Sequence, residues 1–172
     1  MAVDEVSRMK PGPTRIMWMG AALSLAMAVP LFAQSPSLNG IGAVTLLGED
    51  MNDKDRMCGL TEAAFRTAVA EPVLDGNIRV LPDGTGNVYL YFKTNTLYLE
   101  SIDMCVTAVD VELRTVTQWH AEPSATATRV TVLLEERGGI LSSSRSLHST
   151  RVNEAARGAA REIVREIRLA NQ

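Results

Sequence analysis

Apolar residues follow three kinds of pattern along this chain. Residues 16–33 form an almost continuous apolar run. Over residues 55–70 and 151–169, apolar residues recur every three or four positions, which predicts two amphipathic helices. Elsewhere, short apolar runs or alternation of apolar and polar residues predict strands. These strands are expected at residues 43–47, 78–82, 88–92, 105–119 and 130–134.

The predicted elements follow one another in the order strand, helix, several strands, helix. Strands joined by short turns pair antiparallel, and two amphipathic helices can cover one face of a sheet. The sequence therefore predicts an α+β fold, a two-layer sandwich in which two helices pack on one face of an antiparallel sheet of 4–5 strands. Residues 34–42, rich in Ser, Pro, Asn and Gly, are expected to be a linker, and residues 43–172 a single domain.

Local signals refine this order. Pro72 is expected to end the first helix, and residues 83–87 to form a hairpin-type turn. The apolar positions change from even to odd numbers near residues 94–96, which predicts a bulge or break there. Residues 137–139, Arg-Gly-Gly, are expected to turn the chain into a short return strand, and Thr150 is expected to cap the last helix.

Composition and charge exclude several classes of protein. The 172 residues include 17 Lys+Arg and 20 Asp+Glu, and the net charge of −3 gives no general reason to bind nucleic acid or anionic lipid. With 46% hydrophobic and 22% charged residues, the chain is unlike disordered proteins. It is too short for a barrel enzyme or a two-domain kinase.

The N-terminal segment, residues 1–33, has the order of an export signal, with basic residues before an apolar run. The basic residues are Arg8, Lys10 and Arg15. Cleavage is expected after Ala33, or alternatively after Ala28. A retained signal-anchor is the competing interpretation, because this run of 18 residues, 15 of them apolar, is just long enough to cross a bilayer core of about 30 Å. Both interpretations place the remaining chain outside the cytoplasm, in the periplasm of an envelope or anchored at its membrane.

The chain has two cysteines, Cys58 in the first predicted helix and Cys105 on the apolar face of the longest predicted strand. An even number of cysteines in an exported chain predicts a disulfide bond between them. Two unpaired buried thiols are the alternative. A redox-active role is disfavoured, because the chain has no C-x-x-C motif.

Neither a metal nor a cofactor site is expected. The acidic residues 49–55 do not have the spacing of a calcium loop, so they predict a solvated loop in which Asp53 or Asp55 caps the first helix. His120 and His148 lack the spacing of metal ligands and are expected in loops or helix caps. The serines between residues 142 and 149 lack the motif of a nucleophilic serine and are expected in turns and caps.

Two tyrosines and a lysine form the candidate binding surface. Tyr89 and Tyr91 alternate with the apolar residues of their strand, and Lys93 follows on the same face. Single-stranded nucleic acid would require more basic residues around the tyrosines. Because exposed tyrosine is enriched at protein interfaces, these three residues are expected to face a protein partner.

Three segments resemble a group of small exported bacterial proteins to which no activity is assigned. They are MNDKDRMCGL at residues 51–60, VYLYFKTNTL at residues 88–97 and IRLANQ at residues 167–172. The resemblance covers most of residues 43–172 and implies an exported α+β domain. The order of elements also resembles auxiliary envelope domains that assist larger assemblies, an analogy of fold and not of function.

The sequence thus predicts an exported, non-enzymatic accessory domain that binds another cell-envelope protein through a sheet edge or the tyrosine-bearing face. An alternative is a single-span, membrane-anchored peripheral subunit of a larger membrane complex. A third hypothesis, from a different class, is a small hydrolase or ligand-binding protein that uses Asp110, Glu112 or His120.

Overall fold

The computed structural model describes residues 37–120 and 127–172. The predicted export segment, residues 1–33, lies outside these ranges. Within them, no helix is both long enough and apolar enough to cross a membrane.

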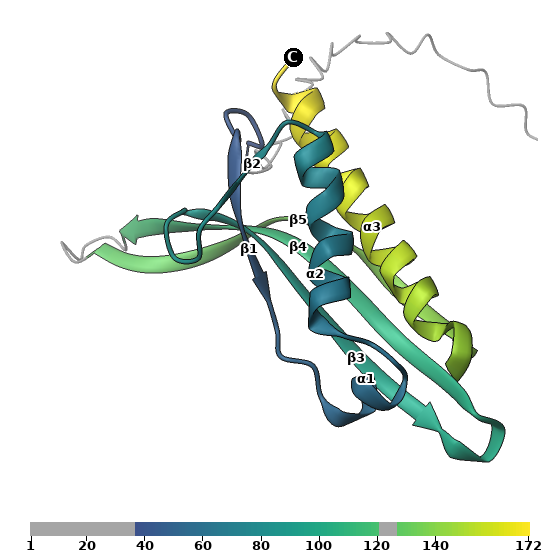
Figure 1. The fold of residues 1–172 in the computed structure, drawn as a ribbon. Coiled ribbons are helices and arrows are strands. Elements are labelled where there is room, and N and C mark those ends of the chain that lie inside the picture. Colours follow the sequence, from purple (N-terminus) through teal and green to yellow (C-terminus); the bar gives the residue numbers. More distant parts are fainter. Residues whose placement is uncertain (1–36, 121–126) are drawn as a thin grey trace, which may run out of the picture. The chain divides into compact units, whose positions relative to one another are not determined.

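Five strands form one sheet in the order β2-β1-β3-β4-β5 (Figure 1). The strands are β1 Ala43–Gly48, β2 Arg79–Leu81, β3 Val88–Leu99, β4 Met104–His120 and β5 Ala127–Ser144. The helices are α1 Asp53–Met57, α2 Glu62–Asp75 and α3 Arg145–Ala170, and a short 3-10 turn, Glu100–Ile102, joins β3 to β4.

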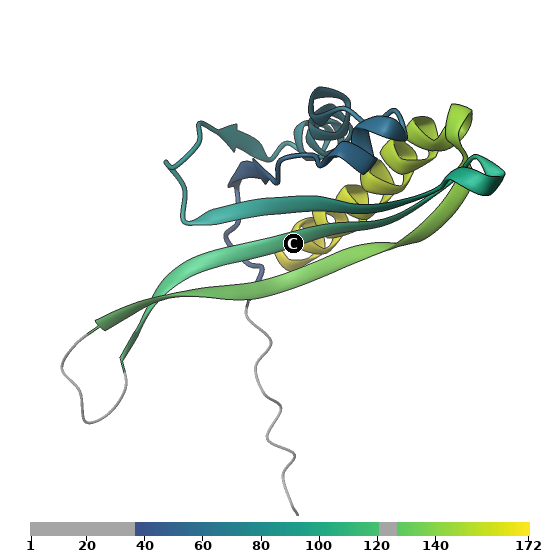
Figure 2. The ribbon, with the colours of Figure 1, turned by 90° about the horizontal axis from the view of Figure 1, so that it is seen from below.

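Helices α2 and α3 lie side by side on one face of the sheet, here called the inner face (Figures 1 and 2). Apolar side chains of this face and of the two helices form the core. Phe65 of α2, for example, meets Phe92 of β3 with ring centroids 5.6 Å apart. No helix among the described residues covers the opposite face, here called the outer face. The predicted α+β fold is therefore confirmed.

The expectation of a wholly antiparallel sheet is wrong, because β1 is parallel to both β2 and β3. Helices α1 and α2 connect β1 to β2, and such a crossover returns the chain in the same direction. The connection 82–87 then leads across β1 to β3, so it is not the predicted hairpin. Its Gly86 lies against Thr45 of β1, where an added Cβ would be 3.0 Å from the hydroxyl oxygen. This crossing explains why Thr45, although on the outer face, is buried.

The predicted helix over residues 55–70 is divided into α1 and α2. Gly59 has φ +78°, a left-handed conformation that favours glycine. The Leu60 N–H donates to the carbonyl of Asp55 and the Gly59 N–H to that of Arg56, the pair of bonds that ends many helices. Pro72 does not end the second helix, which continues to Asp75.

The predicted break near residues 94–96 is also absent, because β3 and β4 pair without interruption from Val88–Thr115 to Leu99–Met104. Thr94 and Thr96 continue the inner face as polar residues, and Leu97 points to the outer face. The irregularity lies instead in the pairing of β4 with β5, between Leu113 and Arg114.

Strand β5 passes straight through residues 137–139, where a turn was expected, and leads directly into α3. The helix begins at Arg145, six residues before the predicted start, so Thr150 lies inside it and Ser144 is the N-cap residue. Beyond Thr115, the only described strand that pairs with β4 is β5, and residues 116–120 and 127–131 form a two-stranded ribbon that extends past β3 (Figure 2).

The two adjacent glycines of β5 are expected to respond differently to substitution. A Cβ at Gly138 would collide with the carbonyl oxygen of Val109, whereas a Cβ at Gly139 would meet no atom within 4 Å. We expect Gly138→Ala to lower the free energy of unfolding by roughly 1–3 kcal/mol. Gly139→Ala, the matched control, should leave it unchanged or raise it slightly. Urea denaturation followed by circular dichroism measures both; equal effects would contradict the close approach of β4 and β5.

Candidate functional site

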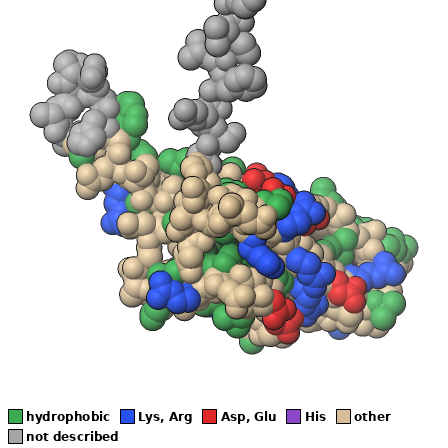
Figure 3. Space-filling model, turned by 90° about the horizontal axis from the view of Figure 1, so that it is seen from above, with side chains coloured by type: hydrophobic (Ala, Val, Ile, Leu, Met, Phe, Trp, Pro, Cys, Tyr) green, Lys and Arg blue, Asp and Glu red, His purple; other side chains and the backbone are tan. Residues whose placement is uncertain are grey.

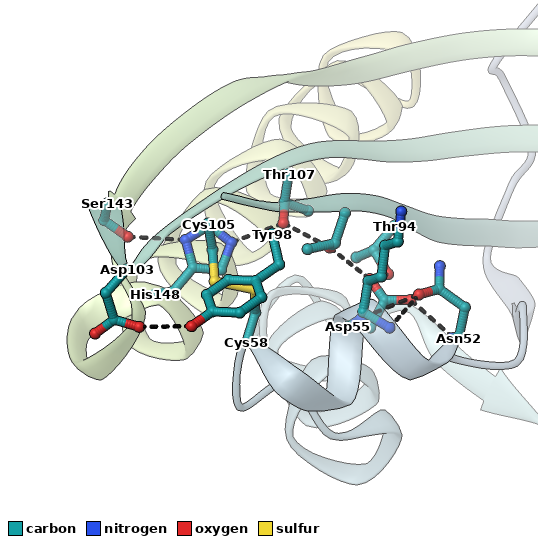
Figure 4. The surroundings of a disulfide bond; sticks show 12 residues. Asn52, Asp55, Cys58, Thr94, Tyr98, Asp103, Cys105, Thr107, Ser143 and His148 are labelled. Carbon is teal, nitrogen blue, oxygen red and sulfur yellow. Dashed lines mark hydrogen bonds between the residues drawn. A yellow bond between two sulfur atoms is a disulfide. The ribbon is translucent and has the colours of Figure 1, made fainter. Parts of the chain in front are cut away.

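A disulfide bond joins Cys58, at the end of α1, to Cys105 of β4, with the two Cα atoms 6.1 Å apart (Figure 4). Both residues are fully buried. The predicted disulfide is therefore confirmed. It fastens the short helix α1 to the central antiparallel part of the sheet.

A chain of buried polar side chains runs beside this disulfide (Figure 4). Ser143 Oγ of β5 is 2.8 Å from His148 Nδ1, and His148 Nε2 is 2.7 Å from Thr107 Oγ1 of β4. The Thr107 hydroxyl is 2.6 Å from that of Thr96, which donates to Asp55 Oδ1 at 2.5 Å. The chain thus links α3, three strands and α1.

The hydrogen bonds of this chain all run in one direction. A carboxylate can only accept hydrogen bonds, so the Thr96 hydroxyl donates its proton to Asp55. It must therefore accept a hydrogen bond from the Thr107 hydroxyl. Thr107 in turn accepts from His148, which places the histidine proton on Nε2. Nδ1 is then free to accept from the Ser143 hydroxyl. Every member has a partner, as buried polar groups require.

Asp55 has a larger role than the capping role expected for Asp53 or Asp55. The N-cap of α1 is Asn52, whose side chain accepts from the N–H groups of Lys54 and Asp55. Asp55 returns the bond by accepting from the Asn52 N–H at 2.8 Å, which completes a capping box. Its other oxygen accepts from Thr94 and Thr96. With 1% of its surface exposed, Asp55 is a buried carboxylate with three donors.

His148 is a buried residue of α3 and not the expected loop or cap histidine. Its two ring bonds tie the first turn of α3 to β4 and β5, which explains why the helix begins as soon as β5 ends. Ser143, expected in a turn, is the buried partner of this ring. Burial lowers the pKa of His148 below the ordinary histidine value.

The lowered pKa predicts a loss of stability in mild acid. Below about pH 6.5, the unfolded chain binds a proton at His148 that the folded chain does not bind. The free energy of unfolding should therefore be greatest above that pH and fall as the pH drops, by at most about 1.4 kcal/mol per unit. Urea denaturation from pH 8 to pH 5 should show a smaller decline for His148→Gln than for the unaltered chain. Parallel curves would contradict the assignment.

Tyr89, Tyr91 and Lys93 lie on the outer face, where their partners in the β4 register are Arg114, Glu112 and Asp110, respectively. Arg114 lies over the Tyr91 ring at 4.2 Å, and Lys93 Nζ is 3.4 Å from a Glu112 oxygen. Partial burial opposes the charge on Arg114, but the hydrogen bond and negative charge of Glu112 outweigh it and raise the pKa of Arg114. The charged groups at the centre of this face thus pair among themselves. Whether the three predicted residues contact a partner stays a prediction.

The outer face becomes apolar and uncharged toward the 3-10 turn. Three consecutive rows of the sheet carry only aliphatic, serine and asparagine side chains there. The aliphatic members are Leu97, Leu99, Met104, Val106, Ala108 and Ile140. Leu97 is 49% exposed and Ile140 is 78% exposed, and contiguous apolar patches of this kind mark interaction sites. The sequence pattern does not reveal this patch, because Leu97 follows an apparent change of face and Ile140 follows two glycines that are typical of a turn.

A cavity of about 440 Å³ opens where α2 and α3 end. Arg161, Arg165 and Arg168 line it beside Pro72 and Val164. The carbonyl ends of the two helices lie near each other at this place (Figure 1), and Arg168, in the last turn of α3, offsets the negative end of that helix dipole. In the view of Figure 3, basic side chains alternate with acidic ones.

The residues that the hydrolase hypothesis would use, Asp110, Glu112 and His120, do not all lie close together. Asp110 and Glu112 lie in the ion-paired centre of the outer face. The backbone of His120, the last residue of β4, is about 26 Å from Glu112 at 3.3 Å per strand residue. No group of three or more His, Cys, Asp or Glu side chains is placed to hold a metal ion within residues 37–120 and 127–172.

Comparison with known proteins adds no family assignment. No protein-family model matches the chain, and no curated protein matches it significantly. The resemblance to small exported bacterial proteins stays a prediction.

Proposed function

We propose that the chain is an exported, non-enzymatic accessory domain that binds another cell-envelope protein through the outer face and the free edge of β5. The observation that carries this proposal is the uncharged aliphatic patch on a sheet face that no described helix covers. A domain that works alone in water gains nothing from an Ile140 that is 78% exposed. Covering that patch with a partner removes it from water.

The disulfide supports the compartment in this proposal. Bonds of this kind persist in oxidising spaces outside the cytoplasm and are rare inside it. Within residues 1–33, basic residues precede an apolar run, and this order supports export independently of the disulfide. Retention of that segment as a membrane anchor is the alternative form of the same proposal, and the intact mass of the mature chain distinguishes the two.

A photo-reactive amino acid placed on the outer face tests the proposal. We expect Leu97 and Ile140, replaced one at a time in the full-length chain, to form covalent adducts with an envelope protein in living cells. Leu74 is the matched control, because it is an exposed apolar residue on α2, away from the outer face. Adducts formed from Leu74 alone, or from none of the three positions, would contradict the proposal.

A further inference from the structure

A groove lies between β5 and α3 at the free edge of the sheet. Its volume is about 280 Å³. Its walls are Gly138 to Leu141 of β5 and, on α3, Ala155, Gly158, Ala159 and Glu162. Arg137 also lines the groove. Its guanidinium forms an ion pair with Glu162 at 3.2 Å, and this pair marks one end of the groove.

The groove exists because glycines stand where side chains would fill it. Gly139 is on the inner face, opposite Val109, and Gly158 faces it from α3. An added Cβ at either glycine would meet no atom within 4 Å. The fold does not use this space for packing, and it stays open at the edge of the sheet, where Gly139 is exposed and Gly158 half-buried.

The strand beside the groove has the properties of an edge that accepts another strand. The outer side of β5 has no strand partner in the part of the chain that the structure describes. Its residues 138–144 contain no charge, no proline and no bulge. Natural edge strands ordinarily carry such features, which prevent association. These seven residues, of which alternate ones direct their backbone groups away from β4, also match the usual length of a strand.

From these observations we infer that a partner adds a strand to the edge of β5 along residues 138–144. The added segment is extended and uncharged, and its inward side chains are small and apolar and enter the groove beneath α3. Free backbone donors and acceptors require a strand, which a helix cannot supply. A second copy of this chain paired antiparallel over the same residues would set its Ser143 opposite Gly139, and a polar side chain does not match an apolar space. The inference rests on the proposed function and names the mode of binding.

Filling the groove should prevent this binding without harming the fold. Gly158→Leu places a side chain in the open space, and leucine favours a helix more than glycine does. Gly158→Ala is the matched control, because it gives a similar gain in helix preference and fills little of the groove. Ser142→Lys is a second blocking variant, since a lysine on an edge strand deters pairing. Thr131→Lys places the same charge on the same strand outside the groove.

The experiment combines these variants with a photo-reactive residue at Ile140 in the full-length, exported chain. We expect the yield of adduct to fall at least tenfold in Gly158→Leu and in Ser142→Lys, and to change less than twofold in the two controls. Mass spectrometry of the adduct should locate the attachment in an uncharged, extended segment of the partner. Thermal unfolding of each variant shows that the fold is kept.

Three results would overturn the inference. They are an undiminished adduct in both blocking variants, an adduct between two copies of this chain, and attachment to a charged or helical segment. An adduct from Leu97 that survives both blocking variants would leave the proposed function standing while removing the strand addition. If neither Leu97 nor Ile140 forms an adduct, the proposed function and the inference both fail.

Discussion

Replacing Cys58 and Cys105 together by alanine is expected to lower the free energy of unfolding by about 4 kcal/mol. The disulfide joins residues 47 positions apart, and loss of this link frees the unfolded chain to explore many more conformations. Urea denaturation followed by circular dichroism measures the difference. Alanine is preferable to serine, since both positions are fully buried and a hydroxyl would lack a partner.

Reduction of the unaltered chain provides the control for this prediction. Dithiothreitol should lower its stability by a similar amount and should not affect the alanine pair. If the reduced chain unfolds at the same urea concentration as the oxidised chain, the disulfide does not constrain the unfolded state.

Removal of the buried carboxylate is expected to have the next largest effect. Asp55→Ala removes the acceptor of three hydrogen bonds and leaves the proton of the buried Thr96 hydroxyl without an acceptor. The loss of a cap costs about 1 kcal/mol and an unsatisfied buried group about 1–3 kcal/mol, so we expect a total of about 3 kcal/mol. The free energy of unfolding in urea is again the measurement.

Two variants test whether the hydrogen-bond chain is the cause. Asp53→Ala changes the same helix at a side chain that is 96% exposed, so its effect should be below about 0.5 kcal/mol. The double variant Asp55→Ala, Thr96→Val lacks the Thr96 hydroxyl that the first change leaves without an acceptor. The combined loss in free energy of unfolding should therefore be smaller than the sum of the two single losses. Additive losses would show that the two residues act independently.

Much of the architecture follows from local patterns. The α+β class, the paired cysteines and the long strand around Cys105 were predicted, because each depends on residues close in sequence or on a simple count. The direction of β1 was not predicted. Its parallel pairing with β2 and β3 depends on two connections, the helical one from β1 to β2 and the one from β2 across β1 to β3. No spacing within a strand reports the identity of its neighbours.

The buried hydrogen-bond chain was hidden for a different reason. Thr94 and Thr96 occupy inner-face positions of β3, and alternation of apolar residues cannot detect a face that becomes polar inside the core. Their acceptor is Asp55, about 40 residues earlier in the chain, a contact that only the fold creates. Likewise, the pair Gly138-Gly139 indicates a turn in sequence, yet in the structure it permits a close approach of strands and an open groove.

The ribbon formed by the ends of β4 and β5 has a practical consequence for these measurements. No third strand lies beside it among residues 37–120 and 127–172, and isolated two-stranded pairs are only marginally stable. Its amide hydrogens therefore exchange through local opening, well before the core unfolds. Trp119 lies in this ribbon with an exposed side chain, so its fluorescence follows the local event. Backbone circular dichroism is consequently the signal that reports cooperative unfolding of this protein.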